Sequence, residues 1–362
     1  MVEFHIAVLP GDGIGPEVIV PSLDLLAAAC RVVGDLKLHF TTLEAGALVY
    51  RERGVAIAEE TVEAAAAADA ILLGAMGLPE VRYPDGREIA PQLDLRERWS
   101  LFAGVHPVRA IPGAPLPLAD SRATGVDFVL VREQTEGLFA ARGRTEHTED
   151  EARDVQVITR AASERLFDFC FRLAERRKAK GHAGVLTCVD KANVLGSMVF
   201  FRRIFDERAK YFPDVAARHR YVDAMALDLI KHPWTFDVMV TENMYGDILS
   251  DLAAGLMGGL GMAPSADIGH HRAVFQPCHG SAPDIAGKGQ ANPTATFLSA
   301  AMMLDWLAER HDEPKAEQAA RLITRAVDRA YAGGSLRPCE FGGPDGTAEV
   351  TRRVLENLQA AA

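Results

Sequence analysis

The chain has 362 residues, of which 48% are hydrophobic and 25% charged, and its formal net charge is −11. This composition is typical of a soluble globular protein, and the length allows two compact domains. The acidic balance argues against nucleic acid or an anionic membrane as a partner, although a locally basic pocket can still bind a small anion.

The spacing of the cysteines and the N-terminal sequence indicate the cellular compartment. The five cysteines include no CxxC pair, which favours buried thiols in a reducing cytoplasm over a disulfide framework or a zinc site. No apolar run reaches membrane-spanning length, and no signal peptide is visible before the first strand. We therefore expect a cytoplasmic protein.

The first third of the chain alternates between apolar strands and helices. Strands are predicted at 5–9, 36–42 and 70–73, and helices at about 19–31 and 59–68. This order favours a parallel sheet with helices on its faces. The first strand leads into Gly11-Asp-Gly-Ile-Gly-Pro-Glu17, whose glycine spacing differs from the dinucleotide-binding GxGxxG. That segment is either a ligand-facing turn or a structural one.

The same alternation continues to the end of the chain. After a loop at 78–92 we predict, in order, a helix at 93–101, a strand at 126–131, an exposed excursion at 141–153, a helix at 161–178, a strand at 185–189, a strand ending at Asp223, a strand at 236–240, a helix at 249–256, a loop at 276–293 and closing helices at 296–309 and 317–332.

Charged side chains follow several of these strands: Arg132, Lys191, Asp223, Asp247 and Asp251. In a parallel sheet the carboxyl ends of the strands meet in one crevice, where α/β proteins bind ligands. Each residue also has a simpler interpretation: a surface ion pair for the arginine, a solvated loop residue for the lysine, a helix N-cap for Asp223. Their recurrence at successive strand ends favours a site.

Asp247 and Asp251 are four residues apart, so on a helix they share one face and repel each other. The pair alone is more typical of a solvated helix face than of a metal site. A hard divalent cation would relieve the repulsion, because Mg²⁺ and Mn²⁺ prefer carboxylate oxygens.

Five ordered segments resemble those of the metal-dependent β-decarboxylating dehydrogenases, a family that includes isopropylmalate, isocitrate, homoisocitrate and tartrate or D-malate dehydrogenases. The segments are Gly11–Glu17, Val131-Arg-Glu133, Asp190-Lys-Ala-Asn193, Asn243–Asp251 and His279–Gly287. The resemblance covers nearly the whole chain, and the isopropylmalate enzymes are the most similar in these segments.

The resemblance implies an α/β fold like that of isopropylmalate dehydrogenase, with two α/β domains around a central cleft and parallel or mixed sheets. Residues 1–101 and 258–362 would form a cofactor-binding domain, and residues 102–257 a domain for substrate, metal and dimerisation. It also implies a homodimer with shared active sites, in which Lys191 and Asp223 act in trans on the site of the other chain.

The resemblance further implies oxidation and decarboxylation of a malate-type 2-hydroxy diacid. Asp223, Asp247 and Asp251 would hold Mg²⁺ or Mn²⁺ against the substrate, and Lys191 would assist removal of the C2 hydroxyl proton. Arg96 and Arg132 would hold the departing carboxylate.

The resemblance places the cofactor on the loop from His279 to Asn292. Members that use NAD carry an aspartate followed by an aliphatic residue, as in Asp284-Ile285 here, and a carboxylate would repel the 2′-phosphate of NADP. We therefore expect NAD. The implied cofactor-binding residues are His279, Gly280, Ser281, Asp284, Ile285 and Asn292, with His279 and Asn292 as adenine contacts.

Three pocket positions depart from the family. Phe139 stands where a tyrosine donates the proton that quenches the enol, His106 stands where a third substrate arginine is usual, and Gln92-Leu93 replaces a pair of leucines, with Ile89 at a usually acidic position. Gln92 puts an amide in an otherwise apolar slot, and the charge of His106 depends on pH.

These departures leave three hypotheses open. The first is a dehydrogenase nearest to the isopropylmalate enzymes. The second is a tartrate, D-malate or other 3-substituted-malate dehydrogenase, in which either another group or water protonates the enol or oxidation proceeds without efficient decarboxylation. The third is a catalytically weak, ligand-binding regulatory paralogue, which Phe139 and His106 favour and the retained Lys191 and carboxylates disfavour.

Overall fold

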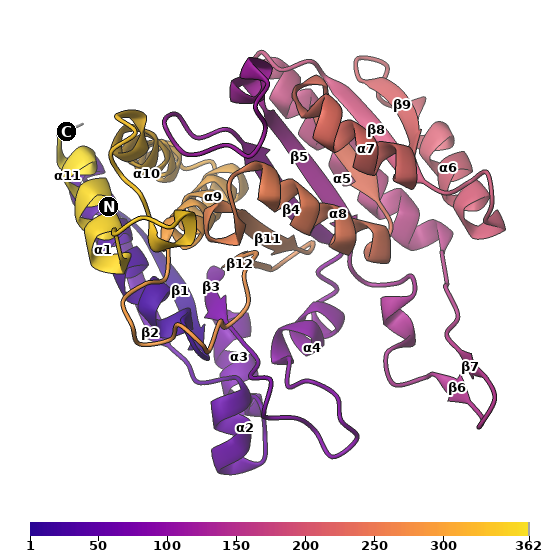
Figure 1. Ribbon diagram of the computed structural model, residues 1–362, viewed down its shortest axis with the longest axis horizontal. Helices are drawn as coiled ribbons and strands as arrows, with labels where there is room; N and C mark the ends of the chain where they lie inside the picture. The colour runs from indigo at the N-terminus through magenta and orange to yellow at the C-terminus, as the bar shows by residue number, and fades with distance from the viewer. Residues whose placement is uncertain (361–362) are drawn as a thin grey trace. The chain divides into compact units, whose positions relative to one another are not determined.

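The computed structural model describes residues 1–360, which form two compact units (Figure 1). The first unit contains Met1–Trp99, Ile111–Pro117 and the described chain from Met257 onward, and the second contains Ser100–Ala110 and Leu118–Leu256. Each unit combines helices with mostly parallel strands. The predicted α/β class with parallel or mixed sheets is confirmed.

The strands of the first unit lie in the order β2 (Leu36–Thr42), β1 (Val2–Gly11), β3 (Ala70–Ala75), β12 (Ala273–Pro277) and β11 (Pro264–Ile268). Neighbours are parallel except for β11, which is antiparallel to β12. Strands β11 and β12 were not predicted, because Pro264, Asp267 and Gln276 interrupt their apolar pattern.

The helices of the first unit are α1 (Gly15–Val33), α2 (Ala47–Arg53), α3 (Glu59–Ala67), α4 (Pro91–Arg98), α9 (Thr294–His311), α10 (Pro314–Ala332) and α11 (Thr347–Gln359), with short 3-10 turns η4 (Leu260–Met262) and η5 (Cys339–Phe341). Helix α9 packs on β3, β11 and β12, and α1, α10 and α11 pack together (Figure 1). Helices α2 and α11 were not predicted.

In the second unit the strands lie in the order β4 (Ala103–Arg109), β5 (Asp127–Glu133), β10 (Val238–Thr241), β8 (Val185–Asp190) and β9 (Ala216–Tyr221). Only β4 is antiparallel to its neighbour. The helices are α5 (Arg160–Ala179), α6 (Gly196–Ala209), α7 (Val222–Lys231) and α8 (Asn243–Leu256), with 3-10 turns η1 (Ser121–Gly125), η2 (Phe139–Ala141) and η3 (Pro233–Thr235).

Several boundaries in the second unit differ from the predictions. Strand β9 ends at Tyr221, so Asp223 lies in the first turn of α7 and not at a strand end. Helix α8 begins at Asn243, six residues before the predicted start, and therefore carries both Asp247 and Asp251. The predicted excursion contains an exposed two-stranded hairpin, β6 (Glu146–His147) and β7 (Ala152–Arg153) (Figure 1).

Within residues 1–360, none of the helices combines the length and the apolar character that crossing a bilayer requires.

Candidate active site

The strand ends of the second unit gather the predicted residues at one edge of its sheet. Strands β5, β10, β8 and β9 are adjacent and parallel, so their carboxyl ends lie side by side. Arg132 is the penultimate residue of β5, and Lys191 directly follows β8. Asp223 and the α8 aspartates lie in the helices that follow β9 and β10. This is the edge at which α/β proteins bind ligands.

Asp247 and Asp251 lie one turn apart on α8. Partial desolvation and the neighbouring Asp247 carboxylate raise the pKa of Asp251 above its ordinary value. Arg132 Nη1 hydrogen-bonds to Asp247 Oδ1, and half of the Asp247 side chain remains exposed. Two crowded carboxylates with exposed oxygens are the donor set that a hard divalent cation requires, so these residues fit the predicted metal.

The orientation of Arg132 depends on a residue that the sequence analysis did not single out. Asn243, at the start of α8, accepts hydrogen bonds from Arg132 Nε (3.0 Å) and Nη2 (2.8 Å), and its own amide donates to the Glu136 carbonyl (2.8 Å). A Cβ at Gly246 would lie 2.5 Å from Arg132 Cγ, so glycine leaves room for the arginine. The guanidinium of Arg132 is thereby fixed beside Asp247.

Lys191 and Asp223 form an ion pair with 2.7 Å between Nζ and Oδ1. The hydrogen bond from Lys191 lowers the pKa of Asp223, whose side chain is 69% exposed. The preceding Asp190 is fully buried and binds both Arg202 (2.7 Å to each of two nitrogens) and the Ala192 amide (2.8 Å). Asp190 therefore holds the turn that presents Lys191.

The carboxylates do not complete a metal site within one chain. Among the described residues, no group of three or more His, Cys, Asp or Glu side chains is arranged to hold a metal ion. The contribution of Asp223 in trans remains a prediction.

Arg96 lies on α4 in the first unit and is held by a residue of β11. Its Nε donates to Oδ2 of Asp267 (2.7 Å), which also accepts a hydrogen bond from Gln276 Nε2 (2.9 Å). Asp267 is 1% exposed, and within residues 1–360 its Oδ1 has no hydrogen-bond partner. Asp267 was not predicted as a partner of Arg96, because it lies in the unpredicted strand β11.

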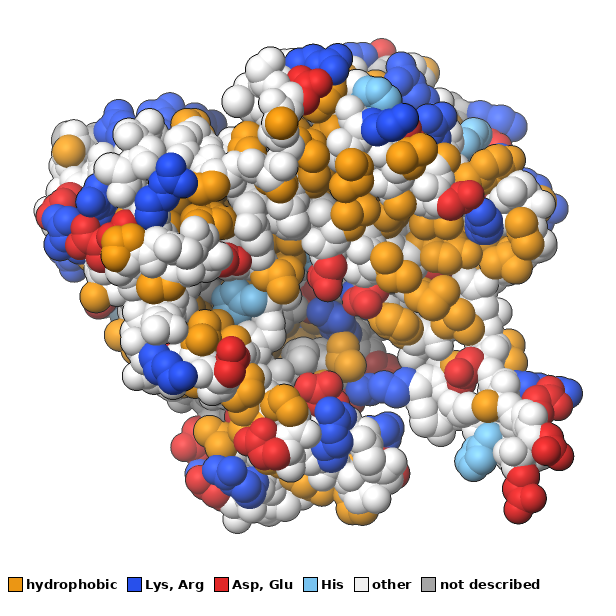
Figure 2. Space-filling view, in the orientation of Figure 1, with side chains coloured by type: hydrophobic (Ala, Val, Ile, Leu, Met, Phe, Trp, Pro, Cys, Tyr) orange, Lys and Arg blue, Asp and Glu red, His pale blue; other side chains and the backbone are white. Residues whose placement is uncertain are grey.

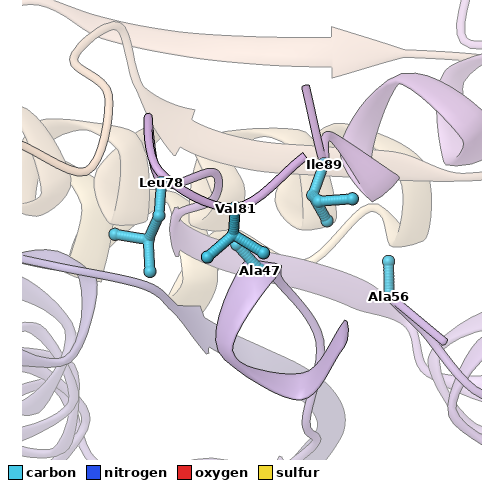
Figure 3. Close-up of a cluster of buried hydrophobic side chains, with 5 residues drawn as sticks. All are labelled: Ala47, Ala56, Leu78, Val81 and Ile89. Atoms are coloured by element: carbon cyan, nitrogen blue, oxygen red, sulfur yellow. The ribbon is translucent and has the colours of Figure 1, made fainter. Parts of the chain in front are cut away.

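Gln92 lies four residues before Arg96 on α4, so the two share a helix face. The Oε1 atom of Gln92 is buried and has no hydrogen-bond partner in the described part of the chain. Ile89 is fully buried in a hydrophobic cluster with Ala47, Ala56, Leu78 and Val81 (Figure 3). Ile89 therefore supports the segment before α4.

Phe139 and His106 lie in different parts of the second unit. Phe139 is in η2 and is 43% exposed, and the Arg132 guanidinium lies 5.2 Å from its ring centroid. A phenyl ring at this position can attract the arginine but cannot donate a proton. His106 is buried in β4, which the sequence analysis missed.

The loop from His279 to Asn292 presents two groups suited to a dinucleotide. His279 Nδ1 donates to the Gly280 carbonyl (2.9 Å), burial lowers its pKa, and its Nε2 is buried without a partner among residues 1–360. A neutral imidazole with a free acceptor suits the adenine amino group. The Asp284 side chain is exposed and could accept ribose hydroxyls. These residues fit the predicted cofactor.

The side-chain amide of Asn292 already has hydrogen-bond partners within the chain. It is buried, its Nδ2 donates to Glu340 Oε2 (3.1 Å), and its Oδ1 accepts a hydrogen bond from Thr294 Oγ1 (2.8 Å). An adenine contact at this residue would therefore use its backbone.

The glycine-rich turn before α1 has a structural explanation. Gly11 and Gly13 adopt φ values of 75° and 58°, and a Cβ at Gly13 would clash with the Ser281 carbonyl. The buried Asp12 accepts hydrogen bonds from the amides of Ala47 (2.7 Å), Leu48 (2.9 Å) and Gly77 (2.8 Å). These contacts favour the structural alternative for the turn.

We expect Asp251→Asn to flatten the dependence of stability on pH when divalent metal is absent. Because the folded-state pKa of Asp251 is raised, the folded protein loses stability as pH rises from the ordinary value of 3.8 through that raised pKa. Asparagine removes this slope, and the gain at neutral pH should be only about 0.2–0.5 kcal/mol because the side chain is largely exposed. Urea denaturation in EDTA between about pH 4 and pH 7 measures it. An unchanged slope would contradict the repulsion.

Comparisons with known proteins agree with this geometry. The family model described as isocitrate/isopropylmalate dehydrogenase matches residues 5–354. A 3-isopropylmalate dehydrogenase of Moorella thermoacetica is 42% identical over 98% of this chain and 99% of its own. A probable tartrate dehydrogenase/decarboxylase of Agrobacterium vitis is 39% identical over 99% and 98%. The crystal structure of isocitrate dehydrogenase from Methylococcus capsulatus has a TM-score of 0.85 at 35% identity and covers 98% of this chain and 99% of that one.

Proposed function

The chain belongs to the isocitrate/isopropylmalate dehydrogenase family, and from this premise we propose that it oxidises a malate-type 2-hydroxy diacid with NAD and Mg²⁺ or Mn²⁺. The family and the named relatives are decarboxylating dehydrogenases acting on CH–OH groups, and the chain is an enzyme of that class. Family members generally depend on NAD(P) and a divalent metal. The proposal rests on the Asp247–Asp251 pair beside Arg132 at the ligand-binding edge of the sheet.

Each protein group has a definite part in the proposed reaction. A divalent cation held by Asp247, Asp251 and Asp223 of the partner subunit would polarise the C2 hydroxyl and offset negative charge that develops during decarboxylation. Lys191 of the partner subunit, in its neutral form, would accept the hydroxyl proton, and NAD, when bound, would supply the acceptor for the hydride from C2. Arg132, fixed by Asn243, holds the carboxylate that departs. Arg96 keeps its proposed role of binding a carboxylate of the substrate.

The substrate itself has two candidates. The similarity to 3-isopropylmalate dehydrogenases favours 3-isopropylmalate. A second candidate is a malate whose substituent carries a hydroxyl, such as tartrate, because Gln92 Oε1 and Asp267 Oδ1 are buried acceptors near Arg96 without partners in the described chain. Buried acceptors are stabilised by a donor, which an isopropyl group lacks.

One assay separates the candidates. Purified protein with Mn²⁺ and NAD is given 3-isopropylmalate, tartrate and D-malate while NADH and CO₂ are followed together. We expect turnover with at least one acid. Formation of NADH without release of CO₂ would indicate oxidation without decarboxylation. If none of the three acids gives NADH, the proposed activity is contradicted and a ligand-binding role is favoured.

Changing Phe139→Tyr is expected to raise the amount of CO₂ released per NADH. The added hydroxyl supplies a proton donor next to Arg132, and such a donor is commonly worth about 10²-fold or more in the step that needs it. Phe139→Leu, which also lacks a hydroxyl, is the matched control. If the ratio of CO₂ to NADH is the same in wild type, Phe139→Tyr and Phe139→Leu, the missing hydroxyl does not limit decarboxylation.

NAD is the proposed cofactor because of Asp284 and Ile285. The exposed Asp284 carboxylate can accept both ribose hydroxyls of NAD and would repel the 2′-phosphate of NADP. Ile285 packs against the cluster of Ile14, Val18 and Ala291, which fixes the backbone beside Asp284.

The proposed homodimer has a suitable surface on α7 and α8. Leu227, Ile230 and Ile248 are 55%, 47% and 61% exposed, and Figure 2 shows hydrophobic side chains gathered over these helices. Such a patch is typical of a protein interface. Asp223 lies one turn before Leu227, and Ile248 follows Asp247 directly. A second copy on this face would therefore bring the Asp223 of one chain toward the α8 carboxylates of the other.

A further inference from the structure

Glu17 joins the start of α1 to the proposed cofactor loop. Its Oε2 accepts a hydrogen bond from the Gly287 amide (3.1 Å), and its Oε1 accepts one from the Ala291 amide (3.0 Å). The hydroxyl of Thr347, the first residue of α11, lies 2.7 Å from Oε1 and 2.6 Å from the Ala291 carbonyl. One carboxylate thus ties the loop to α1, which packs against α11 (Figure 1).

The other end of the loop has its own anchor. Ser281 Oγ donates to the Gly77 carbonyl (2.5 Å), and the Ser281 carbonyl accepts a hydrogen bond from the Ile14 amide (2.8 Å). Asp284 and Ile285 lie between this anchor and the Glu17 contacts. The backbone of the loop has only turns of its own, so the contacts with its neighbours determine its position.

A carboxylate is the group that this geometry requires. Two separate backbone amides each need an acceptor, and each oxygen of Glu17 serves one of them. Glutamine has a single acceptor oxygen, so its NH₂ group would face the second amide and leave that amide unpaired. Glu17 also lies in the first turn of α1, where a negative charge favours the helix.

We propose that Glu17 is a positioning residue for cofactor recognition. By holding Gly287 and Ala291, it keeps the Asp284 carboxylate in place before the cofactor arrives. This inference rests on the proposed binding of NAD by the loop. A loop that is already ordered does not lose conformational entropy when NAD binds. The contacts of Glu17 should therefore increase the affinity for NAD and contribute little to the chemical step.

The test compares Glu17→Gln with Glu60→Gln. Glu60 is an exposed acid in the first turn of α3, so it controls for the loss of charge at a helix start. We expect Glu17→Gln to raise the KM for NAD by about 10–100-fold, with kcat at saturating NAD and the KM for the organic acid within about threefold of wild type. Hydrogen exchange of the backbone amides at 284–291 should be faster in Glu17→Gln than in wild type. Glu60→Gln should change none of these.

Two further variants distinguish a failure of the positioning role of Glu17 from a failure of the cofactor assignment. Thr347→Val removes the hydroxyl and leaves both amide contacts, so we expect a smaller rise in the KM for NAD, and this milder change serves if Glu17→Gln does not fold. Asp284→Asn tests the cofactor assignment directly. If Asp284→Asn weakens NAD binding and Glu17→Gln does not, the positioning role is wrong while the cofactor site stands. If neither variant affects NAD binding, the loop is not the cofactor site and both proposals fail.

Discussion

Replacing Lys191 with methionine is expected to lower kcat by about 10²–10⁴-fold, because the variant cannot accept the proton of the C2 hydroxyl. Methionine keeps an unbranched chain of similar length, so packing around the turn should change little. The turn itself is held by Asp190, whose contacts with Arg202 and the Ala192 amide do not involve the Lys191 side chain. We therefore expect a folded protein that binds NAD and metal but turns over slowly.

Steady-state NADH production at saturating substrate measures this effect. Lys210→Met, at an exposed lysine that follows α6, is the matched control and should retain wild-type kcat. The KM for NAD should be unchanged in Lys191→Met, because the proposed role of Lys191 is proton transfer and not cofactor binding. A Lys191→Met enzyme with more than a tenth of wild-type kcat would exclude Lys191 as the principal base.

Changing Asp247→Asn is expected to lower activity by at least about 10²-fold at a fixed Mn²⁺ concentration, because a metal ligand loses its charge. It also removes the charge that pairs with Arg132, although Asn243 still holds that guanidinium through two hydrogen bonds. The loss should therefore appear mainly in metal affinity, with the fold intact.

Calorimetric titration with Mn²⁺, together with activity as a function of Mn²⁺ concentration, measures the loss of metal affinity in Asp247→Asn. Asp150→Asn, at an exposed residue of the turn between β6 and β7, removes the same charge from the same unit and should bind Mn²⁺ as wild type does. If Asp247→Asn binds Mn²⁺ with wild-type affinity, Asp247 is not a metal ligand and the site must be assigned elsewhere.

The sequence predicted best those elements whose signal is local. Strand β2 was predicted with its observed bounds, and α5, α9 and α10 within three residues at each end, because their hydrophobic periodicity is regular. The strand-end rule also placed Arg132 and Lys191 at one edge of the second unit, since β5, β10 and β8 are parallel neighbours.

What the sequence did not predict depends on contacts between distant residues. Asp267 is 171 positions from Arg96, and Glu17 is 274 positions from Ala291, so no local pattern connects them. Asn243 gave a weak signal as a polar residue that one residue, Glu242, separates from the buried strand β10, and Asp190 gave a similar one next to Lys191. In both cases the residue type was visible, but its hydrogen-bond partner was not.

The central claim is that each active site is assembled from two chains, and mixed dimers test it most directly. Lys191→Met and Asp247→Asn chains, each inactive alone, are unfolded together, refolded and checked by native mass spectrometry. If Lys191 acts in trans, a mixed dimer has one site with both residues intact, so a random mixture should recover about a quarter of wild-type activity. If mixed dimers form and no activity returns, Lys191 and Asp247 serve the same site from one chain, and the shared site is wrong.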